Sequence, residues 1–78
     1  MSKSFYSKIL DDIEDARRKI VSIHSSLELR AETTLDSEEQ RDLYAIMSIL
    51  SAMHNSLREM YVQLEGLRKR CEKHEQRT

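Results

Sequence analysis

The sequence has no proline and no tryptophan, and it has only one glycine and one cysteine. Because proline and glycine are the residues that most often interrupt helices, this composition predicts long, nearly uninterrupted helices. The single cysteine, Cys71, excludes an intrachain disulfide, and a lone thiol is typical of a reducing cytoplasm. One glycine cannot form the glycine-rich loop that cradles nucleotide phosphates, so nucleotide binding by that route is excluded.

Long apolar runs are also missing. No stretch approaches the roughly 18 apolar residues that a membrane-spanning helix requires, and residues 1–6 lack the apolar run of a secretory signal. We therefore expect a cytoplasmic protein with no membrane partner. The formal net charge of −1 gives no overall attraction to nucleic acid. Only residues 66–78 are locally basic, with five basic and two acidic side chains.

The N-terminal half carries a heptad repeat, in which apolar residues recur at alternating spacings of three and four. These residues are Tyr6, Ile9, Ile13, Ala16, Ile20, Ile23 and Leu27. Residues 6, 13, 20 and 27 occupy the a positions, and residues 9, 16 and 23 the d positions. At the flanking e positions, Leu10, His24 and Ala31 widen the apolar stripe. The pattern predicts an amphipathic helix over about 5–31.

The C-terminal half carries a longer repeat of the same kind. Its a and d positions are Leu43, Ile46, Leu50, Met53, Leu57, Met60, Leu64, Leu67 and Cys71, and its e positions include Met47, His54 and Tyr61. Asp36 precedes Glu39 by three residues, and Ser37 precedes Gln40 by three. Both pairs have capping-box spacing, which marks a helix start. We expect a second helix over about 37–74. Tyr44 and Ile49 lie outside the apolar stripe and suggest a second contact surface.

Residues 32–36 break the heptad phase and contain two threonines, which are poor helix formers, so they are expected to form a turn. A turn of about five residues normally joins antiparallel helices. The sequence therefore predicts an all-α, coiled-coil-like antiparallel two-helix hairpin in one domain, 1–78. In this hairpin a residues would face d residues, for example Ile20 opposite Met53. One unbroken helix, or two helices docking separately, are the alternatives.

Two helices alone leave one side of the apolar stripe in water, and a chain this short has marginal stability unless something is added. We therefore expect a second copy, or another helical protein, to complete a four-helix bundle. The expected core of that interface is Ile9, Ile13, Ile20, Ile23, Leu50, Met53, Leu57, Met60, Leu64 and Leu67. The expected flank is Leu10, His24, Met47, His54 and Tyr61.

Little in the sequence points to chemistry. Cys71 and His74 have the spacing of two zinc ligands on one helix, but two further ligands are missing. No heptad core position is acidic, unlike the inward-facing carboxylates of di-iron bundles. His24 and His54 flank the core, where protonation could weaken an interface. We expect no metal, no cofactor, no small-molecule substrate and no enzymatic activity.

The basic C-terminal segment supports a second hypothesis. Arg68, Lys69, Arg70 and Lys73 could contact nucleic acid or an acidic partner. Cations near a helix C-terminus are favourable in any helix, however, and no aromatic residues for base stacking are interleaved with them. The hairpin resembles, in architecture alone, Rop-type plasmid regulators, small secretion co-chaperones, and phage or bacterial inhibitors.

The sequence thus favours a small non-catalytic protein-protein interaction module, such as an adaptor, inhibitor or co-chaperone. The alternative is a Rop-like nucleic-acid-binding regulator that uses the basic segment.

Overall fold

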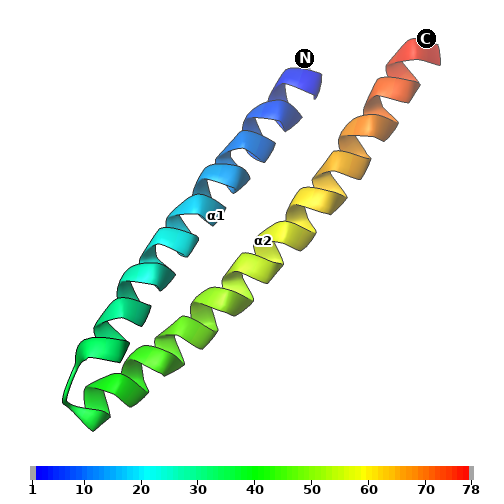
Figure 1. Cartoon of the computed structure of the whole chain (residues 1–78). Helices are drawn as coiled ribbons and strands as arrows, with labels where there is room; N and C mark the ends of the chain where they lie inside the picture. Colours follow the sequence, from blue (N-terminus) through cyan, green and yellow to red (C-terminus); the bar gives the residue numbers. More distant parts are fainter. Residues whose placement is uncertain (1, 78) are drawn as a thin grey trace.

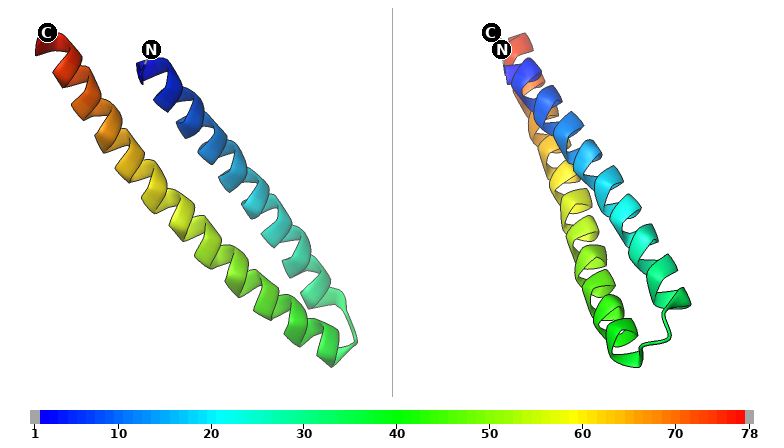
Figure 2. Two further views of the ribbon diagram at one scale, coloured as in Figure 1. Left: turned by 180° about the vertical axis from the view of Figure 1, so that it is seen from behind. Right: turned by 90° about the vertical axis from the view of Figure 1, so that its left-hand side faces the viewer.

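A computed structural model describes the backbone of residues 2–77 and the side chains of residues 5–73. It contains two helices, α1 (Ser2–Thr33) and α2 (Ser37–Arg77), and no strand in the described part of the chain. The helices run antiparallel, side by side, with both termini at one end (Figures 1 and 2). The predicted all-α antiparallel hairpin is therefore confirmed.

The hairpin is long and thin, measuring 64 by 15 by 11 Å along its principal axes. α2 is longer than α1, at 41 against 32 residues, and extends past it at the open end (Figure 1). It also continues through Gly66, as expected for a single glycine inside an otherwise strong helical pattern. No third element covers either face of the hairpin within the described residues.

The turn is shorter than expected, because α1 extends two residues beyond 31 and leaves only residues 34–36 between the helices. Thr33 is the last residue of α1, and its hydroxyl donates to the carbonyl oxygen of Leu29 at 2.9 Å. The backbone N–H of Thr34 then donates to the carbonyl oxygen of Arg30 at 2.9 Å. Leu35 lies at the tip and is fully exposed.

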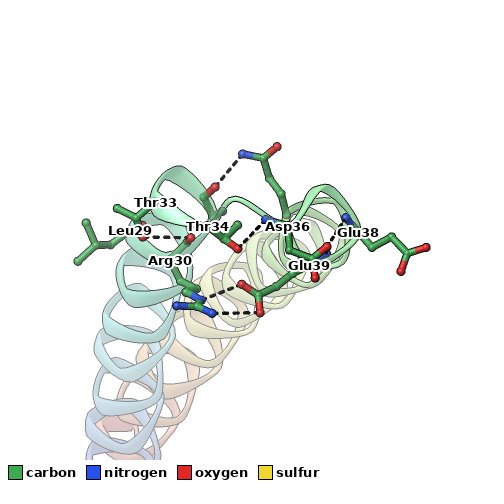
Figure 3. A network of polar contacts seen from close by, with 9 residues as sticks. Leu29, Arg30, Thr33, Thr34, Asp36, Glu38 and Glu39 are labelled. Carbon is green, nitrogen blue, oxygen red and sulfur yellow. Dashed lines mark hydrogen bonds and ion pairs between the residues drawn. The ribbon is translucent and has the colours of Figure 1, made fainter.

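Asp36 caps the start of α2, as its capping-box spacing predicted. Its carboxylate accepts hydrogen bonds from the backbone N–H groups of Glu38 at 2.9 Å and Glu39 at 3.2 Å. The reciprocal bond of a full capping box is absent here, because the N–H of Asp36 donates to the Thr34 hydroxyl instead, at 3.2 Å. The Glu39 side chain is thereby left to contact α1 (Figure 3).

Two side-chain bridges tie the helices together beside the turn. The Arg30 guanidinium donates two hydrogen bonds to the Glu39 carboxylate, at 2.7 and 3.3 Å (Figure 3). The Gln40 amide donates to the carbonyl oxygen of Ala31 at 2.8 Å and satisfies one of the free carbonyls at the end of α1. The hydrogen bond from Arg30 lowers the pKa of Glu39, and a hydrogen bond from Thr34 lowers it further by a smaller amount.

Candidate protein-interaction surface

The seam between the two helices is built from a and e positions. The six buried apolar side chains of the described residues are Leu10, Ile13, Ile20, Ala31, Met47 and Leu50. Each of them occupies an a or e position of the heptads. Half-buried residues at the same positions, including Leu27, Leu57 and Leu64, extend the seam along the hairpin.

This seam differs from the a-against-d pairing that the sequence predicted. Ile23, Met53 and Met60, at d positions, are 48%, 47% and 49% exposed in the hairpin. The e residues Leu10 and Met47, expected at the flank, lie in the core of the seam instead. The a, d and e rows together form a stripe wider than one neighbouring helix can cover, so a single partner buries two rows and leaves the third in water.

A shallow pocket beside the seam is consistent with this arrangement. It is lined by Ile20, His24, Leu50 and His54, so e residues of both helices lie beside these a residues. The sequence predicted the d residues Met53 and Ile23 in their place. Each helix is therefore rotated toward its e row by about one heptad position relative to the expected packing.

The d residues of both helices lie on one face of the hairpin. This follows because two antiparallel packed helices, related by an approximate two-fold axis, present equivalent heptad positions to the same side. Between residues 9 and 23 of α1 and 46 and 67 of α2 these residues are Ile9, Ala16, Ile23, Ile46, Met53, Met60 and Leu67, and we call them the d face. All of them are apolar, and none is fully buried. The next d positions toward the turn, Arg30 and Glu39, are charged and bond each other.

Ile49 extends the d face sideways. It occupies the neighbouring g position, is 60% exposed, and lines a shallow hollow with Ala52, Met53 and Leu57. Tyr44 is also exposed, but its b position places it on the opposite face. The two residues that the sequence suggested as one second contact surface therefore lie on different faces.

The opposite face of the hairpin is more polar. There His24 and His54, both half-buried, line a shallow pocket with Val21, Ser51 and Asn55. Within the described residues, no hydrogen bond joins a histidine of this pocket to a serine.

Two arginines occupy e positions and were not recognised from the sequence as seam residues. Arg17 bonds Glu14 at 2.6 Å, and its buried Nε has no hydrogen-bond partner. The Nε of Arg68 is buried in the same way. The aliphatic stems of such side chains can cover apolar neighbours while the charged ends reach water. Because the residue type is charged, the sequence pattern alone did not indicate that these side chains would be partly buried.

The basic segment is only partly available to a partner. Arg68 bonds Glu65 and, at 3.2 Å, Glu72, so its charge is compensated within α2. The hydrogen bond from Arg68 lowers the pKa of Glu65. The other three residues of the segment, Lys69, Arg70 and Lys73, are exposed.

Cys71 lies half-buried near the open end, close to Tyr6 of α1. Burial raises the pKa of the Tyr6 phenol, and the contact with Cys71 raises it further. The side chain of His74, the other candidate zinc ligand, lies outside the described residues. Among the side chains of residues 5–73, no cluster of three or more potential metal ligands occurs.

Comparisons with known proteins add no identification. The chain matches no protein-family model, and neither the curated proteins nor the solved structures contain a match. Neither helix, over its described residues, is long and apolar enough to cross a membrane.

Proposed function

We propose that this chain is a non-catalytic protein-interaction module that buries the d face against helices of another chain. The completed assembly would be a four-helix bundle, formed with a second copy or with another helical protein. One observation carries the proposal: four apolar residues of the d face, Ile23, Ile46, Met53 and Met60, remain 46% to 49% exposed in the hairpin.

The exposed area is large enough to matter energetically. Ile23, Ile46, Ile49, Met53 and Met60 are each 46% to 60% exposed. Because full burial of such a side chain is worth about 1.5–3 kcal/mol, covering the remaining half gains about 1 kcal/mol each. Five residues give about 5 kcal/mol per hairpin, and a matching partner face doubles this, against an association cost of roughly 4–15 kcal/mol.

The nucleic-acid alternative receives less support from the contacts. Arg68, the first residue of the basic segment, is bonded to two glutamates, and only three exposed cations of that segment remain. A protein that neutralises few phosphates binds nucleic acid weakly at physiological salt. The d face, by contrast, keeps Ile23, Met53 and Met60 about half exposed in the isolated hairpin.

The methionines provide a direct test of whether the d face is covered. Met53 and Met60 are about half exposed, whereas Met47 in the seam is 7% exposed. Oxidative footprinting, read by mass spectrometry, should oxidise Met53 and Met60 in denaturant but protect them strongly when the native protein is assembled. The measurement is made on the purified protein and again after addition to native cell extract.

Matched variants make the test specific. Ile46→Asp should abolish the protection of Met53 and Met60, because it places a charge in the d face. Val62→Asp, at an exposed f position away from the d face, should leave the protection unchanged. If Met53 and Met60 oxidise freely in both the purified protein and the extract, the d face is not an interface and the proposed function is wrong.

A further inference from the structure

The two ends of the hairpin carry opposite charge. The turn end, residues 28–42, has six acidic residues (Glu28, Glu32, Asp36, Glu38, Glu39 and Asp42) and two basic ones (Arg30 and Arg41), for a net charge of −4. The open end, residues 5–9 and 65–73, has five basic residues (Lys8, Arg68, Lys69, Arg70 and Lys73) and two acidic residues (Glu65 and Glu72), for a net charge of +3.

These charges cannot compensate one another within one molecule. The hairpin is 64 Å long, whereas the screening length at physiological ionic strength is about 8 Å. A partner that lies along the d face would therefore meet an acidic end and a basic end at the same time. The partner that complements this pattern must carry a basic end beside the turn and an acidic end beside the termini.

We propose that the partner is a second copy of this chain, packed antiparallel so that the turn end of each hairpin lies beside the open end of the other. This inference rests on the proposed function of the d face. The antiparallel arrangement pairs −4 with +3 at both ends of the bundle. A parallel arrangement would instead bring the two acidic turn ends together and the two basic open ends together.

The exposure of the d face suits a dimer of this kind. Ile23, Ile46, Met53 and Met60 are 46% to 49% exposed, and the equivalent face of a second copy would cover them.

The orientation can be measured by pulsed electron-electron spin resonance. A single spin label is placed on Leu35→Cys, at the tip of the turn, in the full chain with Cys71→Ser. The antiparallel dimer should give a label separation of about 50–60 Å, because each tip lies roughly half a hairpin length from the two-fold axis. A parallel dimer would give about 10–25 Å, the separation of neighbouring helices plus the labels.

A label on Asn55→Cys in the same background serves as the control. Asn55 lies near the middle of the hairpin and away from the d face, so either orientation gives a separation below about 40 Å. Light scattering establishes the molecular mass of each labelled protein, and melting curves establish that the fold survives the substitutions.

The salt dependence of dimerisation provides an independent test of the orientation. For the antiparallel dimer, the dissociation constant should rise roughly three- to tenfold from 10 to 150 mM salt, as the screening length falls from about 30 to about 8 Å. A parallel dimer would show the opposite trend, because salt would relieve repulsion between like ends.

The outcomes separate the orientation from the proposed function. A dimer with a long Leu35 separation and salt-weakened association supports the proposal. A dimer with a short separation overturns the orientation. A purified monomer overturns the second copy, while the proposed function survives if Met53 and Met60 are protected in cell extract. A dimer in which Met53 and Met60 remain freely oxidised overturns the antiparallel arrangement and the proposed function together.

Discussion

Two methionines six residues apart distinguish the seam from the d face. Met47 is 7% exposed and Met53 is 47% exposed in the hairpin. Replacing a buried methionine by alanine costs about 2–5 kcal/mol, and the slender two-helix seam places Met47→Ala at the lower end, about 2–3 kcal/mol. Met53→Ala should cost only about 1 kcal/mol in the isolated hairpin, because half of its side chain is already in water.

The measurement is urea unfolding followed by circular dichroism, repeated over a wide range of protein concentration. At low concentration, where the hairpin is monomeric, Met47→Ala should be clearly more destabilising than Met53→Ala. At high concentration the cost of Met53→Ala should rise toward that of Met47→Ala, since assembly buries Met53 as well. Equal costs in the monomer would show that the a and e rows do not form the seam.

Three further substitutions test local features. Asp36→Ala should lower the unfolding free energy by about 1 kcal/mol through loss of the α2 cap, and Asp36→Asn should restore most of it in thermal melts. Gly66→Ala should raise the unfolding free energy by about 0.5–1 kcal/mol, because alanine favours the helix and an added Cβ meets no atom within 4 Å. If the substitution instead lowers the unfolding free energy of the assembled protein, a partner packs against Gly66. Glu39 has a lowered pKa, so its contribution is present above about pH 4.5 and lost as pH falls further; Glu39→Gln should flatten this dependence in acid titrations of stability.

Much of the fold could be predicted from the sequence. The unbroken alternation of threes and fours fixes two amphipathic helices, and Asp36 supplies a cap whose hydrogen bonds the structure shows. The end of α1 was less predictable. Thr33 is a poor helix former, yet it ends α1 with its hydroxyl bonded to a preceding carbonyl. Such local bonds depend on side-chain rotamers that the residue pattern does not specify.

The candidate surface was only partly predictable. Its d residues were expected in an interface core, and whether a partner covers them remains a prediction. The burial of Leu10 and Met47, and the half-burial of Arg17 and Arg68, could not be deduced from residue type. The e rows mix apolar, histidine and arginine side chains, so they give a weaker signal than the apolar d rows.

The sequence by itself determined the two helices, the position of the turn and the identity of the apolar rows, because these depend on residue spacing and on local hydrogen bonds. Only the tertiary structure decided that a and e rows meet within the hairpin while the d rows face outward. The rotation of one helix against another is set by the fit of whole side-chain rows and by contacts such as Arg30 with Glu39. Since a three-row stripe can be buried in more than one way, its spacing alone does not choose between them.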